Sequence, residues 1–152
     1  MSRPRYLGIS LEFASALNPE PGVKRAPTLN EQKRALDAAV TRKGGVLLQT
    51  DVSVRQNEGL DHGILAVIEK NGAEAIIFLT IDVLRRDSQI DIDLLQSIWD
   101  RTGRIDLLIE DVSLTDDASF DQYVNMVAAI NAVRERDSSA EWHALIMGSD
   151  FS

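Results

Sequence analysis

Four short runs of apolar residues are spread along the chain, at residues 6–11, 46–48, 75–79 and 105–109. Each run is nearly continuous rather than alternating with polar residues. Short continuous apolar runs are typical of strands that are buried on both faces of a sheet. The chain is therefore predicted to contain four strands of a covered sheet.

Segments with helical periodicity follow the four runs. Capping boxes at residues 28–31 and 119–122 predict where the first and the last helix begin. The second helix is predicted to begin at Leu60, and Asp87 and Ser88 are predicted to cap the third. The faces expected to be buried are Leu29, Leu36, Ala39 and Val40; Leu60, Ile64, Val67 and Ile68; Leu94, Leu95, Ile98 and Trp99; and Tyr123, Val127, Ile130 and Val133.

Strands and helices alternate along the chain, which predicts an α/β fold with a mainly parallel sheet of four to five strands and helices on both faces. We predict one domain over residues 1–152, with a proline-rich loop at residues 18–27, a polar connection at residues 53–59 and one more short helix after residue 137. Ligands of such sheets bind beyond the carboxyl ends of the strands. The polar residues expected there are Ser10, Glu12, Asp51, Ser53, Asp82, Arg85, Arg86, Glu110 and Asp111.

Composition narrows the class of protein. Hydrophobic residues make up 44% of the 152 residues and charged residues 26%, which is typical of a globular protein and excludes disorder along the whole chain. No apolar run is long enough to span a membrane, and no signal peptide is evident, so a cytoplasmic location is expected. The chain has no cysteine, which excludes disulfides, thiolate metal sites and cysteine nucleophiles.

The charge of the chain is uneven. Basic and acidic residues balance through Arg104, and the last 48 residues, with 2 basic and 10 acidic, carry the whole net charge of −8. An acidic surface repels phosphate backbones, so this third of the chain is not expected to bind DNA. The simplest interpretation of the acidic surface is solubility.

Most local motifs for catalysis are absent. No glycine-rich phosphate loop follows a strand, and His62 and His143 lack the spacing of metal ligands. The strand-end carboxylates are one alternative, because hard oxygen ligands bind Mg²⁺. They would make a magnesium-dependent phosphate enzyme, although acids are also common in loops and caps. These carboxylates are Asp51, Asp82, Glu110 and Asp111.

Several short motifs occur in a distinctive order. The first strand reads Tyr-Leu-Gly-Ile-Ser at residues 6–10, the first helix carries Gln32, the second strand ends at Asp51, and residues 81–86 read Ile-Asp-Val-Leu-Arg-Arg. In this order the chain resembles the N-terminal catalytic domain of the serine recombinases, the resolvase/invertase family. That family has Tyr-x-Arg-Val-Ser on its first strand and Leu-Asp-Arg-Leu-x-Arg after its third. The resemblance covers roughly residues 5–120.

The resemblance implies a resolvase-like fold, no cofactor and a serine nucleophile. In the family this serine attacks a DNA phosphodiester and becomes joined to the 5′ phosphate, while arginines stabilise the charge of the transition state. The resemblance places this chemistry on Ser10, Gln32, Asp51, Asp82 and Arg86.

The chain departs from the family at three arginine positions, which here are Gly8, Asn57 and Val83. Loss of one charged donor costs about 3 kcal/mol in a transition state, so little strand cleavage is expected. The family also continues into a DNA-binding domain, whereas this chain stops at Ser152 and no such domain is expected. The last predicted helix has only Arg134 and Arg136 as cations among acids.

Three functions follow as hypotheses. The first is a catalytically degenerate, regulatory or interaction protein linked to DNA recombination. It would form a homodimer or bind a protein partner through the helix at residues 119–136. The second is a residual serine recombinase that cleaves and rejoins DNA through a phosphoserine intermediate at Ser10. The third is the magnesium-dependent phosphate enzyme. DNA is expected to bind weakly if at all, and no membrane partner is expected.

Overall fold

The computed structural model of the chain describes residues 3–13, 26–49 and 52–138. The main sheet has six strands: β1 (Arg5–Glu12), β2 (Val46–Leu47), β3 (Val52–Arg55), β4 (Ala75–Phe78), β7 (Ile105–Leu107) and β8 (Val112–Leu114). The helices are α2 (Leu29–Arg42), α3 (Ile64–Asn71), α4 (Ile92–Thr102) and α5 (Asp117–Ser138), with a 3₁₀ turn η1 (Ile81–Leu84) and a small hairpin of β5 (Arg85–Arg86) and β6 (Gln89–Ile90).

The strand order in the sheet is β2-β1-β4-β7-β8, and β3 also pairs with β1. All pairings are parallel except that of β7 with β8. The mainly parallel α/β sheet expected from the alternating pattern is therefore confirmed. The structure corrects the prediction that residues 53–59 form only a polar connection, because β3 occupies Val52–Arg55.

Strands β2 and β3 share one edge of β1. Arg5 and Tyr6 pair with β2, whereas Ile9 through Glu12 pair with β3, and β4 occupies the opposite edge. The two short strands thus act as one edge strand that is interrupted between Leu47 and Val52. This interruption lies beside the middle of β1.

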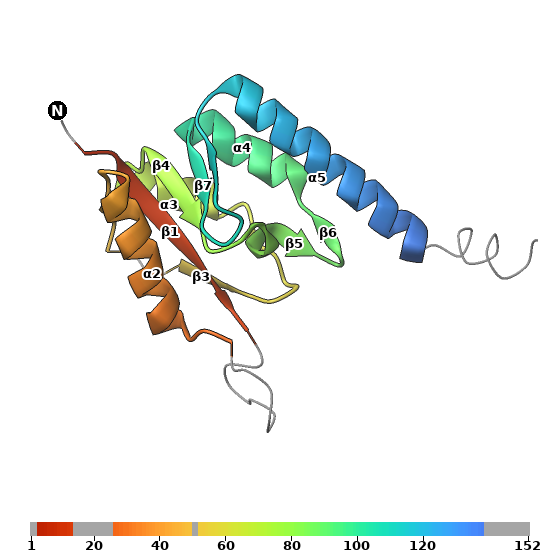
Figure 1. Cartoon of the computed structure of the whole chain (residues 1–152), viewed down its shortest axis with the longest axis horizontal. Coiled ribbons are helices and arrows are strands. Elements are labelled where there is room, and N and C mark those ends of the chain that lie inside the picture. Colours follow the sequence, from red (N-terminus) through yellow and green to blue (C-terminus); the bar gives the residue numbers. More distant parts are fainter. Residues whose placement is uncertain (1–2, 14–25, 50–51, 139–152) are drawn as a thin grey trace, which may run out of the picture.

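Helices cover both faces of the sheet, with α2 on one face and α3 on the other (Figure 1). The odd residues of β1, Leu7, Ile9 and Leu11, belong to the larger core with α3, α4 and α5. On the other face Tyr6 packs in a smaller core that contains Leu36, Ala39, Val40, Ala75 and Ile77. Alternation along β1 therefore directs Ser10 toward α2.

The beginning of α2 is as expected. The Thr28 hydroxyl accepts a hydrogen bond from the Glu31 amide at 3.2 Å, and the Glu31 carboxylate accepts one from the Thr28 amide at 3.2 Å. Both interactions satisfy amides that have no partner within the helix. This capping box therefore sets the residue at which α2 begins, beside the end of β1.

The predicted cap of the third helix is wrong. Asp87 and Ser88 form the turn of the β5–β6 hairpin, with φ angles of 52° and 73°. Two successive positive φ angles match the twist of a two-residue hairpin turn. Asp91 caps α4 instead, because its carboxylate accepts a hydrogen bond from the Leu94 amide at 3.1 Å. Arg86 therefore lies on a hairpin rather than at a helix start.

Two other helix starts differ from the prediction. Helix α3 begins at Ile64, and Leu60 is buried before it, where its amide donates to the Val83 carbonyl at 2.9 Å. Helix α5 begins at Asp117. It is capped because the Asp116 carboxylate accepts a hydrogen bond from the Ser119 amide at 2.7 Å and the Ser119 hydroxyl accepts one from the Asp116 amide at 3.3 Å. Helix α5 continues to Ser138, and the further short helix predicted in the tail around Trp142 lies outside the described residues.

Helix α5 divides its apolar residues between two faces. Phe120, Tyr123 and Val127 are buried in the core. Met126, Ile130 and Val133 are exposed over 49%, 42% and 60% of their surface. The stripe predicted from the sequence thus belongs partly to the core and partly to the outer surface. No helix within the described ranges is long and apolar enough to cross a membrane.

Candidate functional site at the carboxyl end of β1

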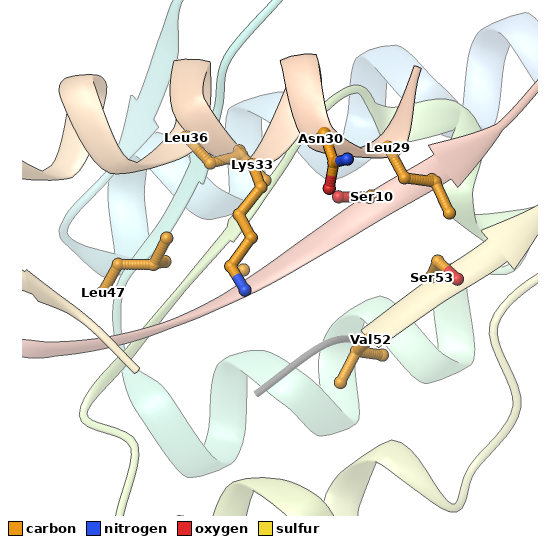
Figure 2. A pocket seen from close by; sticks show the side chains of 9 residues that line it. Ser10, Leu29, Asn30, Lys33, Leu36, Leu47, Val52 and Ser53 are labelled. Atoms are coloured by element: carbon orange, nitrogen blue, oxygen red, sulfur yellow. The ribbon is translucent and has the colours of Figure 1, made fainter. Parts of the chain in front are cut away.

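Ser10 lies near the carboxyl end of β1, in register with Ser53 of β3. Its surface is 9% exposed, and its side chain lines a cavity of about 240 Å³ between β1, β3 and α2. Asn30 and Lys33 of α2 line the same cavity, and Figure 2 shows the Asn30 side chain directed toward Ser10. The strand-end position predicted for Ser10 is therefore a recessed one with polar neighbours.

The cavity exists because of two features of the chain. The edge strand is interrupted between Leu47 and Val52, and both of these residues line the opening. Gly8 contributes no side chain to it, and a Cβ atom there would lie 3.0 Å from Cδ1 of Leu47 and 3.5 Å from Cδ1 of Leu36. A larger residue at this position would fill the space, so the glycine keeps the cavity open.

Gln32 is a second predicted site residue close to Ser10. It is buried on α2, where its amide nitrogen donates to the Leu11 carbonyl at 2.6 Å and to the Pro27 carbonyl at 3.2 Å. Its amide oxygen accepts from the Leu11 amide at 2.8 Å. The side chain thus clamps the end of β1 to the start of α2, and it positions the residue that follows Ser10.

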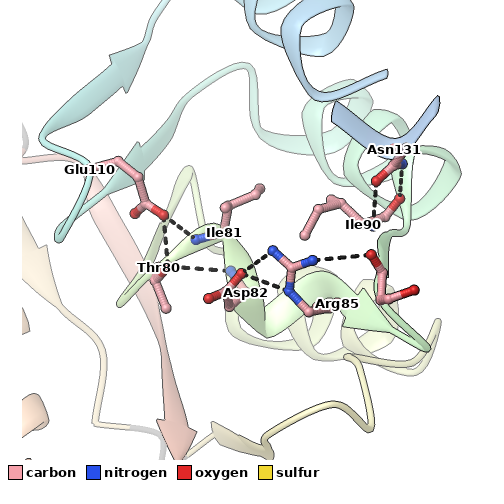
Figure 3. Close-up of polar contacts among 8 residues, drawn as sticks. Thr80, Ile81, Asp82, Arg85, Ile90, Glu110 and Asn131 are labelled. Carbon is pink, nitrogen blue, oxygen red and sulfur yellow. Dashed lines mark hydrogen bonds and ion pairs between the residues drawn. The ribbon is translucent and has the colours of Figure 1, made fainter. Parts of the chain in front are cut away.

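Asp82 lies elsewhere, on the η1 turn after β4. Its carboxylate accepts two hydrogen bonds from Arg85, from Nε at 2.9 Å and from Nη2 at 2.6 Å (Figure 3). Arg85 also donates to the Ser88 carbonyl at 3.2 Å. This ion pair joins the turn to the hairpin, and neither residue lines the Ser10 cavity.

Glu110 connects the ends of two parallel strands. One carboxylate oxygen accepts hydrogen bonds from the Thr80 hydroxyl at 2.7 Å and from the Ile81 amide at 3.0 Å (Figure 3). Its other oxygen is buried and has no hydrogen-bond partner in the described part of the chain. Burial, together with the negative charges of Glu110 and Asp82, raises the pKa of the Tyr123 hydroxyl.

Arg86 is exposed, and its guanidinium donates to the Leu60 carbonyl at 3.3 Å. It lines a separate hollow beside Asn131 rather than the Ser10 cavity. Arg55 is also exposed and lies 3.9 Å from the Glu12 carboxylate. Among the described residues that line the Ser10 cavity, Lys33 carries the only charge.

The predicted site residues therefore fall into two groups. Ser10 and Gln32 meet at the end of β1, whereas Asp82 and Arg86 lie around the hairpin after β4. Asp51 lies outside the described residues. Asn30 and Lys33 were not predicted. Helical spacing could have pointed to Lys33, because positions 29, 33 and 36 lie on one face of a helix.

The three positions that carry arginine in the resembled family have distinct environments here. Val83 is fully buried in the larger core. Asn57 lies in an exposed turn with a φ angle of 69°. Gly8 borders the cavity without a side chain. None of them supplies a cation to Ser10.

The described ranges contain no group of three or more histidine, aspartate or glutamate side chains arranged to hold a metal ion. Asp82 is engaged by Arg85, and Glu110 is engaged by Thr80 and Ile81. Asp111 is exposed, and Asp51 and His143 lie outside the described residues. The geometry thus gives no support to the magnesium-dependent phosphate enzyme.

Comparison with known proteins identifies the fold. No protein-family model matches the chain, and no curated protein sequence matches it. Among solved structures, the N-terminal catalytic domain of TP901-1 integrase, a serine recombinase, is similar with a TM-score of 0.55 and 13% sequence identity. The match covers 89% of this chain and 99% of the other. It confirms the resolvase-like fold that the order of motifs predicted.

Proposed function

We propose that this chain, which has the fold of a serine recombinase catalytic domain, acts as a self-associating regulatory or interaction protein in DNA recombination and not as a strand-transfer enzyme. The exposed apolar stripe of α5 carries this proposal. Met126, Ile130 and Val133 are spaced four and three residues apart, so they form one line along the helix. Three exposed apolar side chains in one line are typical of a surface that is covered in an assembly.

A second copy of the chain is the occupant that we propose for this stripe. Figure 1 shows that α5 runs past the β5–β6 hairpin. Asn131 faces the hairpin and bonds to Ile90, whereas Met126, Ile130 and Val133 are exposed. A twofold axis would place each stripe against its equivalent, which makes one surface complementary to itself. The likeness to a serine recombinase domain supports this choice, because the resembled family associates through the same helix.

The surroundings of Ser10 support the loss of strand-transfer chemistry. Phosphoryl transfer is catalysed mainly by cations placed around the charge that develops in the transition state. Arg85 is held by Asp82, and Arg86 is held at the Leu60 carbonyl. The single lysine at the cavity is a poor substitute for several bidentate guanidinium groups.

The test is the oligomeric state of the full chain, measured by analytical ultracentrifugation over a range of concentrations. We expect a dimer that Ile130→Glu weakens about tenfold or more, because a carboxylate would be buried without a partner. Ala128→Glu is the matched control, since Ala128 is exposed on the opposite side of α5. A chain that stays monomeric at high concentration would refute self-association.

The recessed position of Ser10 keeps a residual serine recombinase as the second candidate. This function requires DNA binding, which fluorescence anisotropy with a mixed-sequence duplex at low salt would measure. Salt-sensitive micromolar binding, followed by a covalent adduct that Ser10→Ala abolishes, would favour the enzyme. Absence of binding would remove DNA as a direct partner and leave the interaction protein.

A further inference from the structure

A groove of about 620 Å³ lies between β3 and the first half of α3, on the face of the sheet opposite to α2. Val52 and Val54 face this side, as do the β1 residues with which they are paired. Figure 2 shows Val52 directed away from α2. The other apolar residues of the lining are Leu60, Ile64 and Val67. Because Val52 and Val67 are only half-buried, the floor of the groove leaves apolar surface for a partner to cover.

The outer edge of β3 also offers backbone groups along this groove. Within the described residues β3 pairs only with β1, and the Gln56 amide donates to the Glu12 carbonyl at 3.1 Å. Since alternate residues of a strand bond to the same neighbour, the amide and the carbonyl of Ser53 point away from β1. The Arg55 carbonyl accepts a hydrogen bond from the Glu58 amide at 3.1 Å. An extended segment can therefore form a single bridge at Ser53, but it cannot continue the sheet.

The rim of the groove is acidic. Its charged residues are three acids and one base, namely Glu12, Glu58, Asp61 and Arg55. Arg55 lies 3.9 Å from the Glu12 carboxylate, so these two charges offset one another. Glu58 and Asp61 are exposed, and neither forms an ion pair with another residue in the described part of the chain. Charge complementarity therefore favours a cationic partner and opposes a nucleic acid.

We propose that this groove binds an extended basic segment of a partner protein. The apolar side chains of the segment contact Val52 and Val67, and its cationic side chains reach Glu58 and Asp61. Successive side chains of an extended segment point to opposite sides, so alternating basic and apolar residues meet the rim with one set and the floor with the other. The groove includes no residue of the exposed stripe of α5, so this binding goes beyond the proposed self-association and does not depend on it.

The test titrates short peptides with blocked ends into the isotope-labelled full chain and follows its amide resonances by nuclear magnetic resonance. The probe is Arg-Val-Arg-Val-Arg, and its controls are Glu-Val-Glu-Val-Glu, which reverses the charge, and Arg-Ser-Arg-Ser-Arg, which removes the apolar contacts. We expect the probe to shift the amides of Ser53, Arg55 and Val67, and each control to bind about fivefold more weakly or less. The inference is overturned if the probe shifts none of these amides at millimolar concentration, or if either control binds as tightly as the probe.

Matched double variants distinguish the groove from general attraction to an acidic protein. Glu58→Gln with Asp61→Asn should weaken probe binding about fivefold, because it removes two rim charges and keeps the oxygen that accepts the hydrogen bond at position 61. Asp37→Asn with Glu74→Gln removes the same charge from exposed positions outside the groove and should leave binding unchanged. Equal effects of the two double variants would refute the inference. Ile130→Glu should bind the probe as the native chain does, so this inference and self-association can fail separately.

Discussion

Gln32 illustrates how a single side chain can matter to a site without reacting in it. Its amide satisfies both backbone groups of Leu11 and the carbonyl of Pro27. These groups lie at the end of β1, next to Ser10. Any chemistry or binding at Ser10 therefore depends on this clamp, even though the amide is fully engaged by backbone atoms.

Replacement of Gln32 by leucine should destabilise the chain by about 2 to 4 kcal/mol, because it leaves buried backbone groups without partners. Urea unfolding followed by circular dichroism measures this free energy. Gln96→Leu is the control, since Gln96 is exposed on α4, and its cost should stay within about 0.5 kcal/mol. Equal losses for the two variants would mean that the clamp contributes little.

The two tyrosines of the chain offer a second residue-scale prediction. Burial and the charge of Asp106 raise the pKa of Tyr6, and burial with Glu110 and Asp82 raises the pKa of Tyr123, both from an ordinary value of 10.0. Because both pKa values are raised in the folded chain, the neutral form of each tyrosine hydroxyl stabilises the fold. This stabilisation is complete below pH 10 and is lost as the pH rises toward the folded-state values.

Ultraviolet difference spectroscopy should therefore show no tyrosinate in the folded chain at pH 10, where free tyrosine is half ionised. Ionisation should appear together with alkaline unfolding. The double variant Tyr6→Phe and Tyr123→Phe should resist alkaline unfolding better than the native chain. Tyrosinate formation near pH 10 without unfolding would contradict the buried environment of both hydroxyls.

At the scale of elements, the β5–β6 hairpin is the least expected part of the fold. Its two-residue turn places Asp87 and Ser88 at positive φ, a conformation that costs most residues energy and that glycine adopts freely. Arg85 holds the turn through the Ser88 carbonyl, and Asn131 of α5 bonds to both backbone groups of Ile90. Contacts from Arg85 of the hairpin itself and from Asn131 of α5 thus stabilise a turn that the residues at its two central positions do not favour.

Ser88→Gly should therefore stabilise the chain by about 0.5 kcal/mol, because it relieves the left-handed strain while leaving the carbonyl contact with Arg85 intact. Thermal unfolding measured by calorimetry reports the change. Ser97→Gly in α4 is the matched control and should destabilise by about 0.5 to 1 kcal/mol. A loss of stability in Ser88→Gly would show that the serine side chain itself holds the turn.

Comparison of elements shows which signals in the sequence were sufficient. The continuous runs at β1, β4 and β7 predicted buried strands, and glycines 72 and 103 end α3 and α4 in the left-handed conformation. Strand β3 was missed because Val-Ser-Val-Arg is short and half polar. The hairpin was missed because Asp-Ser before an apolar segment has the local pattern of a helix cap.

The candidate site, like the fold, was predictable only in part from the sequence. The end of β1 followed from the apolar run, so Ser10 was expected there, and Gln32 followed from the resemblance. The positions of Asp82 and Arg86 relative to Ser10 depend on how η1 and the hairpin fold after β4, and no local pattern encodes that path. The cavity depends on a gap between two strands, which is a tertiary feature.

At the scale of the whole molecule, net charge opposes self-association. Each copy carries a net charge of −8, so two copies repel one another. If an apolar stripe holds the dimer, salt should strengthen it, because the Debye length falls from about 10 Å at about 0.1 M salt to about 3 Å at about 1 M. Sedimentation at the two salt concentrations measures the change, and dissociation at high salt would instead indicate an interface held by ion pairs.

The shortness of the edge strands has a consequence for how such molecules avoid aggregation. Exposed strand edges invite pairing with other chains, and long regular edges do so most strongly. Here one edge is divided into strands of two and four residues, and the other ends in a strand of three. Within residues 3–13, 26–49 and 52–138, neither edge offers a continuous ladder for a foreign strand, so open-ended growth of the sheet through these strands is disfavoured.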